Sequence, residues 1–178
     1  MASTSATLIV LFVAVVCGVS GAVGSANSAL DQVCEFVGAS YVTPELCASA
    51  LCYDPVSPCR DARDYAAVAS LAARLLARNG TATRDSVAVA ARAANATAGL
   101  KSCLQLYDGL VPALEWAAGS VAAGRAYGAA RELMQATQFA QRACAGMVGA
   151  EMPRENGGFV TMATVAHAVL STSVPKTD

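Results

Sequence analysis

Apolar residues in this chain recur at steps of three and four over long stretches, and this spacing strongly limits the possible folds. Such steps keep side chains on one face of an α-helix, whereas a half-buried strand requires strict alternation of apolar and polar residues. From residue 28 onward the sequence contains almost no alternation of that kind. We therefore expect an all-α protein.

Four amphipathic segments follow residue 60. The expected apolar stripes are Tyr65, Val68, Ala72, Leu75 and Leu76; then Leu100, Cys103, Leu104, Tyr107, Leu110, Val111, Leu114, Ala117, Ala118 and Val121; then Ala129, Leu133, Thr137, Ala140, Cys144 and Met147; and finally Phe159, Met162, Ala163, Ala166, Val169 and Leu170. Short connections place successive helices antiparallel. The sequence therefore predicts an up-down-up-down four-helix bundle over residues 61–174, with its last helix beginning near Gly157 and Gly158.

Two positions interrupt the helical pattern. Asn79 and Gly80 lie inside the segment 61–94, where we expect either a break or a weak turn. Pro112 lies inside the second stripe. Because proline has no N–H to donate and crowds the preceding turn, we expect a bend at this residue.

A pair of short helical segments precedes the bundle, within residues 25–60. The first covers residues 28–39 and the second covers residues 44–53, with Thr43 as its N-cap and Pro44 at its first helical position. Neither segment is long enough to be stable alone. We expect them to form a helical hairpin that needs covalent support.

The first thirty residues contain no charged side chain, and an apolar run from Leu8 to Val16 is followed by small residues. This pattern is typical of a secretory signal peptide, which we assign to residues 1–24. A membrane anchor is the alternative, but a span needs about 20 apolar residues and this run reaches Gly18 too soon. We expect residues 25–178 to form one secreted domain without a membrane segment.

Six cysteines remain once Cys17 is assigned to the signal peptide, and an even number in a secreted chain predicts disulfides. Cys34 with Cys47 would join the hairpin, Cys52 with Cys59 would close a proline-containing turn, and Cys103 with Cys144 would link the two clearest helices. Other pairings of the first four cysteines remain open. Zinc is disfavoured because the chain has no Cys-x-x-Cys pair and a single histidine.

The remaining patterns exclude several functional classes. A net charge of -1 argues against a nucleic-acid partner. The lone His167 has no second histidine for a metal or relay, and we interpret it as a boundary residue of its helix. Asp61 and Asp64 favour helix capping over acid catalysis, and Gly157 and Gly158 lack the context of a phosphate loop. We expect no enzymatic activity, no metal and no cofactor.

Two Asn-x-Thr sequons begin at Asn79 and Asn95, and a secreted chain can be glycosylated at such sites. Asn95 lies in a predicted turn between helices. If residues 61–94 form one helix, Asn79 lies close to the core stripe. We therefore expect Asn95 to be the better glycosylation site.

Three segments of the sequence resemble those of a known protein family. They are Leu100-Lys-Ser-Cys-Leu-Gln-Leu-Tyr-Asp108, Leu114-Glu-Trp-Ala117 and Thr43-Pro-Glu-Leu-Cys-Ala-Ser-Ala-Leu51. With the order of the cysteines, they make the chain after its signal peptide resemble the plant invertase and pectin methylesterase inhibitor family, and within it the branch of pollen-allergen-like invertase inhibitors. The resemblance implies disulfides between Cys34 and Cys47 and between Cys103 and Cys144, which leaves Cys52 and Cys59 as an additional pair. It also implies one long helix over residues 61–94.

The resemblance further implies a secreted inhibitor that occludes the substrate cleft of a plant cell-wall or vacuolar invertase, or of pectin methylesterase. Its place would be the apoplast, the cell wall or the vacuole. Invertase inhibitors of the family carry Pro-Lys-Phe before the last helix, where this chain has Met152-Pro-Arg-Glu155 without a following phenylalanine. Pro153 and Arg154 are therefore the candidate target-binding residues, with a solvated loop as the alternative interpretation.

A second hypothesis comes from a different class of protein. In this hypothesis the chain keeps the scaffold without the inhibitory surface, as a non-inhibitory secreted bundle with a structural role or with a site for a small apolar ligand. Abundant alanine could leave space between the helices for such a ligand, although it more often indicates close packing.

Overall fold

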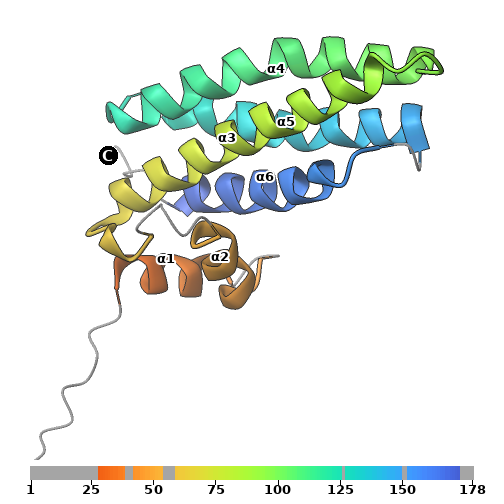
Figure 1. The fold of residues 1–178 in the computed structure, drawn as a ribbon. Coiled ribbons are helices and arrows are strands. Elements are labelled where there is room, and N and C mark those ends of the chain that lie inside the picture. Colours follow the sequence, from red (N-terminus) through yellow and green to blue (C-terminus); the bar gives the residue numbers. More distant parts are fainter. Residues whose placement is uncertain (1–27, 39–41, 54–58, 126, 150–151, 173–178) are drawn as a thin grey trace, which may run out of the picture.

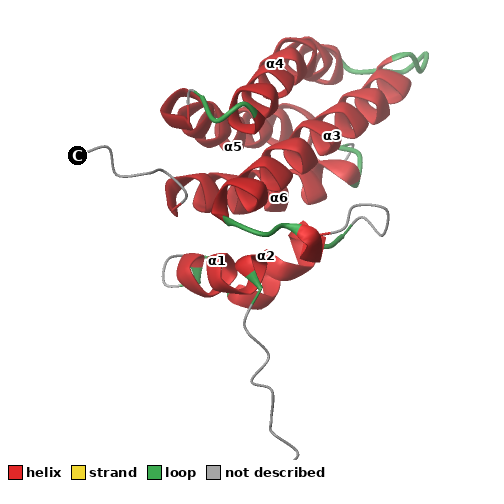
Figure 2. Ribbon diagram, turned by 90° about the vertical axis from the view of Figure 1, so that its left-hand side faces the viewer, coloured by secondary structure: helices red, strands yellow, loops and turns green. Residues whose placement is uncertain are grey.

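The computed structural model describes residues 28–38, 42–53, 59–125, 127–149 and 152–172. Six α-helices make up most of this part, and no strand occurs in it (Figures 1 and 2). They are α1 (Ala29–Val37), α2 (Pro44–Leu51), α3 (Tyr65–Ala91), α4 (Ala98–Ala122), α5 (Tyr127–Val148) and α6 (Glu155–Thr172), with a short 3-10 helix at Cys59–Asp61. The all-α prediction is confirmed.

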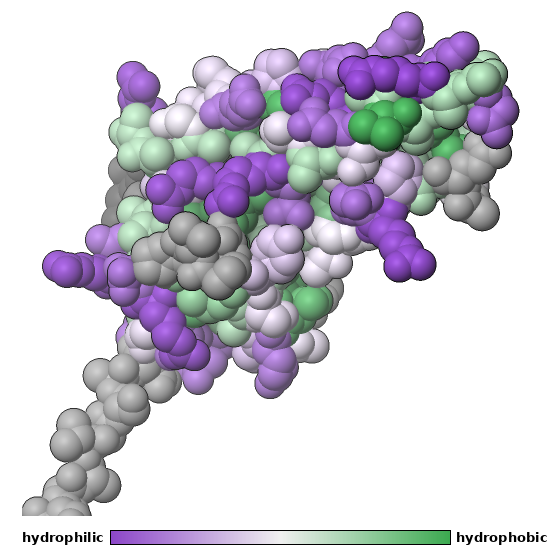
Figure 3. Space-filling model, in the orientation of Figure 1, coloured by the Kyte–Doolittle hydropathy of each residue, from purple (hydrophilic) through white to green (hydrophobic). Residues whose placement is uncertain are grey.

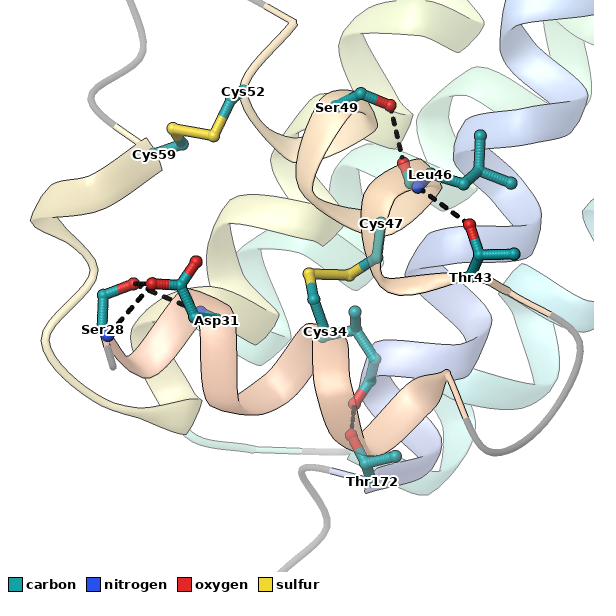
Figure 4. Close-up of a disulfide and its surroundings, with 11 residues drawn as sticks. Ser28, Asp31, Cys34, Thr43, Leu46, Cys47, Ser49, Cys52, Cys59 and Thr172 are labelled. Atoms are coloured by element: carbon teal, nitrogen blue, oxygen red, sulfur yellow. Dashed lines mark hydrogen bonds between the residues drawn. A yellow bond between two sulfur atoms is a disulfide. The ribbon is translucent and has the colours of Figure 1, made fainter. Parts of the chain in front are cut away.

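Helices α1 and α2 form the N-terminal pair, and local capping explains where each begins. The Ser28 hydroxyl accepts a hydrogen bond from the Asp31 N–H, and the Asp31 carboxylate accepts one from the Ser28 N–H (Figure 4). The Ser28 hydroxyl also donates a 2.7 Å hydrogen bond to the Asp31 carboxylate, and this bond, followed by the one from the Ser28 N–H, favours the ionised form and lowers the pKa of Asp31. Thr43 caps α2 and Pro44 is its first residue, so both of these predictions are confirmed.

Helix α3 runs without a break through Asn79 and Gly80, so the break expected there from local propensity is wrong. Gly80 is buried, and a Cβ atom at this position would lie 3.0 Å from Leu114 Cδ1 and 3.2 Å from Phe159 Cε2. The glycine thus allows α3 to approach α4 and α6 closely. Packing on both helices offsets the roughly 1 kcal/mol that glycine costs inside a helix.

Helix α4 continues through the exposed Pro112, and its predicted stripe is almost entirely buried. In α5 the predicted stripe is wrong by about one residue, because Ala129 and Met147 are exposed. The buried residues of α5 are Ala130, Met134, Thr137, Gln141, Cys144 and Val148. Tyr65 at the start of α3 is also exposed, whereas every residue predicted for the last stripe is buried. That last helix begins at Glu155, before the predicted start at Gly157 and Gly158.

The four long helices pack in a ring in which α3 contacts α4 and α6, and α5 contacts the same two helices. The helical pair α1 and α2 lies beside α3 and α6 (Figures 1 and 2). Buried residues from both parts form one hydrophobic core, in which the Tyr107 and Phe159 rings meet edge to face at 5.5 Å. The helical pair and the four long helices therefore share one hydrophobic core.

Three disulfides join Cys34 with Cys47, Cys52 with Cys59, and Cys103 with Cys144. These pairs match the ones favoured from the sequence. Within the described residues, no helix is long and apolar enough to cross a membrane. The signal peptide assigned to residues 1–24, the turn at 54–58 and the tail at 173–178 lie outside the described residues.

Candidate functional site

An open groove of about 360 Å³ lies where the N-terminal helical pair meets the bundle. One wall comes from α2 and from Tyr53, which follows it, through Leu46, Ser49, Ala50 and Tyr53. Their spacing of three and four residues places them on one side of the helix, while Cys47 and Leu51 are buried on another side. Figure 4 shows the Leu46 side chain directed away from the Cys34–Cys47 disulfide and towards α6.

The opposite wall comes from α3 and α6. Helix α3 contributes Asn79 and Ala82, and α6 contributes residues that include Gly158, Thr161 and Met162. The Asn79 amide donates a hydrogen bond of 2.9 Å to the Leu75 carbonyl oxygen, which keeps this polar side chain against its own helix. The groove therefore combines apolar walls with a few polar groups.

Two exposed apolar side chains stand at the hairpin edge of the groove. Tyr53 is 72% exposed and Leu46 is 39% exposed. A smaller hollow of about 120 Å³ shares Tyr53, Asn79 and Ala82 with the groove and adds Arg78. The face of the molecule in Figure 3 mixes hydrophilic and apolar residues, as protein surfaces in general do.

Arg154 lies at the edge of this groove, immediately before α6. It is exposed and forms no ion pair with any described residue. Its carbonyl oxygen accepts a hydrogen bond from the Gly157 N–H, and the carbonyl of the half-buried Pro153 accepts one from the Asn156 N–H. The backbone at Pro153 and Arg154 is thus part of the helix start, so the solvated-loop alternative describes the Arg154 side chain but not its backbone.

A buried hydrogen bond fixes the start of α6 to α4. The Tyr107 hydroxyl donates to the Asn156 side-chain oxygen, and both residues are buried. Burial raises the pKa of Tyr107 far above its usual value, so the phenol stays protonated and remains a donor. Asn156 lies two residues after Arg154, so this bond also limits how far the Arg154 backbone can move.

Disulfides restrain the other side of the groove. Cys34–Cys47 connects α1 with α2, and Cys52–Cys59 connects the end of α2 with the 3-10 helix (Figure 4). Cys52 directly precedes Tyr53 in the chain. The predicted cysteines therefore act in this site as supports for the residues that line it.

The two sequons lie in different surroundings. Asn95 is exposed in the connection between α3 and α4, where Thr97 caps α4 by accepting a hydrogen bond from the Leu100 N–H. Asn79 is half-buried within α3 and lines the groove. Asn95 therefore stays the better predicted site, and a glycan on Asn79 would fill the groove.

Residues considered for catalysis lie apart from the groove or have structural partners. His167 is half-buried on α6, and burial and the charge of Arg131 lower its pKa. Asp64 caps α3 through a 2.8 Å hydrogen bond from the Ala67 N–H, as predicted. No group of three or more histidine, cysteine or acidic residues that could hold a metal occurs in the part of the chain that the structure describes.

Sequence reasoning predicted Pro153 and Arg154 but missed Leu46, Tyr53 and Asn79 as neighbours of Arg154. A spacing of seven residues would place Leu46 and Tyr53 on one side of the helix predicted over residues 44–53, although α2 ends at Leu51. It does not reveal that this side faces α6. Comparisons of the chain with protein-family models, with curated proteins and with solved structures found no match.

Proposed function

We propose that this protein is a secreted inhibitor of a plant invertase, either from the cell wall or from the vacuole, or of pectin methylesterase. The single observation that carries the proposal is Arg154, an exposed cation without an ion pair among the described residues, at the edge of a groove between hairpin and bundle. Inhibition of this kind occludes the substrate cleft of the enzyme and needs no catalytic group. The apoplast, the cell wall or the vacuole is the place where such a target would be met.

Preorganisation is the physical basis of the proposal. A surface that is already ordered loses little conformational entropy when it docks. Here the Tyr107–Asn156 hydrogen bond holds the start of α6, and two disulfides hold α2. The proposal takes α3 to α6 as an antiparallel up-down-up-down bundle that serves as the rigid support.

The positive charge of Arg154 at the edge of the groove suits an enzyme cleft that contains carboxylates. Arg154 would form charge-assisted hydrogen bonds with the carboxylates that glycosidases use in catalysis. Tyr53 and Leu46 would bury apolar surface beside that contact, and large aromatic residues next to arginine are typical of strong binding positions. Arg154, Tyr53 and Leu46 together would exclude the sugar substrate from the cleft of the enzyme.

An inhibition assay tests the proposal directly. The purified protein is added at mildly acidic pH to invertase and, separately, to pectin methylesterase, and the residual activity is measured. We expect inhibition of one of them, weakened at least about tenfold by Arg154→Ala. Arg125→Ala changes an exposed arginine at the connection between α4 and α5 and should leave inhibition unchanged. Full activity of both enzymes would contradict the proposal, and equal effects of the two variants would contradict the site.

One observation favours the second candidate function, a bundle that binds a small apolar ligand. The groove volume of about 360 Å³ lies within the usual range for small-molecule sites, and Leu46, Ala50 and Met162 supply apolar walls. Native mass spectrometry of protein extracted without denaturation checks this function. A bound small molecule that is lost in Leu46→Glu, at a partly exposed position of the groove, would support it, and protein mass alone would count against it.

A further inference from the structure

Helix α5 is apolar on two opposite sides, and the bundle covers only one of them. Its buried side includes Ala130 and Val148. Phe139 lies nine residues from each of these, which is about 180° around the helix at 100° per residue. Phe139 is 61% exposed and Met147 is 46% exposed, so a second apolar side faces solvent.

We call this second side the outer face of α5. It consists of Gly128, Ala129, Glu132, Gln135, Ala136, Phe139, Arg142, Ala143, Gly146 and Met147, all of which are exposed. Five of the ten are alanine or glycine. Small residues allow another helix to approach closely, while Phe139 and Met147 project from between them.

We propose that the outer face of α5 binds a second copy of this chain, with the two α5 helices antiparallel about a two-fold axis. Such an interface is self-complementary, because each residue meets the same patch on the other copy. With the axis crossing the outer face at the level of Thr137 along the helix, Glu132 of one copy lies opposite Arg142 of the other, and this ion pair occurs twice. The Glu132 carboxylate also pairs with Arg131 of its own helix at 2.9 Å, so it would lie between two guanidinium groups. A parallel arrangement would instead bring like charges together.

The side chains near the axis complement one another in size as well as in charge. In the same register Phe139 meets Gln135 of the other copy and packs beside the small Ala136, and Gly128 meets Gly146. The Arg142 guanidinium already lies over the Phe139 ring, 5.9 Å from its centroid. Arg142 is therefore held near the position where Glu132 of the second copy would arrive.

The area of the outer face of α5 determines how strongly two copies are expected to associate. A helix of 22 residues is about 33 Å long, and a strip about 10 Å wide along it covers about 330 Å² on each copy. Stable specific interfaces bury about 800 Å² on each partner. We therefore expect a weak dimer in reversible equilibrium with the monomer.

Sedimentation equilibrium of the purified protein, from about 1 μM to about 1 mM, measures this equilibrium. We expect a concentration-dependent dimer whose dissociation constant rises at least about tenfold in Phe139→Glu. Phe36→Glu is the matched control, because Phe36 is an equally exposed phenylalanine on α1. The dissociation constant of the Phe36→Glu dimer should equal that of the unsubstituted protein.

Charge exchange tests the antiparallel register. Glu132→Arg and Arg142→Glu should each weaken the dimer, and the double variant should restore it because the pair re-forms with reversed signs. A monomer at every concentration would overturn the proposal, and so would a dimer that withstands Phe139→Glu. A double variant no stronger than the single ones would overturn the antiparallel pairing. Circular dichroism establishes that each variant keeps its helices.

Discussion

At the scale of single residues, glycine shows how the same amino acid has different roles in two helices. Gly80 is buried where α3 meets Leu114 and Phe159. Gly119 is exposed in α4, and a Cβ at this position would meet no described atom within 4 Å apart from its chain neighbours and the nearby backbone of its own helix. Glycine is thus required by packing at one position and only weakens the helix at the other.

Replacing each glycine by alanine separates these roles. Gly119→Ala should raise the free energy of unfolding by about 1 kcal/mol, because alanine has the higher helix propensity. Gly80→Ala should show no gain or a loss, because its Cβ would crowd two fully buried side chains. Urea unfolding with the disulfides intact measures both, and equal gains would contradict the packing role of Gly80.

His167 provides a pH-dependent contribution to stability. Its pKa is lowered in the folded state, so the unfolded state binds a proton at a higher pH than the folded state does. Stability should therefore fall as the pH decreases through the ordinary histidine pKa of about 6.5, until the folded state is protonated as well. His167→Gln should remove this decrease in urea unfolding at a series of pH values. If the unsubstituted protein and His167→Gln lost the same stability as the pH falls, titratable groups other than His167 would be the cause.

At the scale of elements, the disulfides differ in the length of chain that they close. Cys103–Cys144 joins α4 to α5 across a sequence separation of 41, whereas Cys52–Cys59 spans 7. A longer loop restricts the unfolded chain more strongly. The chain-entropy model gives about 4 kcal/mol for the long loop and about 2 kcal/mol for the short one.

Removing each disulfide in turn tests this order. The double variant Cys103→Ala/Cys144→Ala should lose more unfolding free energy than Cys52→Ala/Cys59→Ala, by about 2 kcal/mol. Urea unfolding of the oxidised proteins is the measurement. The reverse order would show that native contacts near Cys52 and Cys59 outweigh the loop effect.

At the scale of the whole molecule, hairpin and bundle form one hydrophobic core. Leu30, Val33 and Val37 of α1 are buried and belong to the same cluster as Phe159 and Leu170 of α6. A single shared core favours cooperative unfolding. The groove with Arg154 lies at this junction, so its shape depends on both parts remaining together.

A core substitution in the hairpin checks this cooperativity. Leu30→Ala removes a fully buried side chain and should lower the unfolding free energy by about 2–4 kcal/mol. Circular dichroism during heating should show one transition, shifted to lower temperature as a whole. Two transitions, with the larger one unchanged, would mean that the bundle is stable without the hairpin.

Features that rest on local physics can be predicted from the amino-acid sequence. Helix class follows from apolar spacing, and the starts of α1 and α2 follow from their caps. The sequence favoured the three cysteine pairs but left other pairings of the first four cysteines open. Arg154 became a candidate only through the resemblance to the inhibitor family, whose motif lies before the last helix. Residues 1–24 lie outside the described part, so the signal peptide stays a prediction.

Features that depend on distant neighbours became visible only in the packed helices. Glycine propensity predicted a break in α3, but the close contacts with Leu114 and Phe159 leave little room for a Cβ at that crossing. Because α5 is apolar on two sides, its sequence did not decide which side enters the core. The groove beside Arg154 likewise exists only because α2 lies against α3 and α6, and local sequence does not contain such long-range contacts.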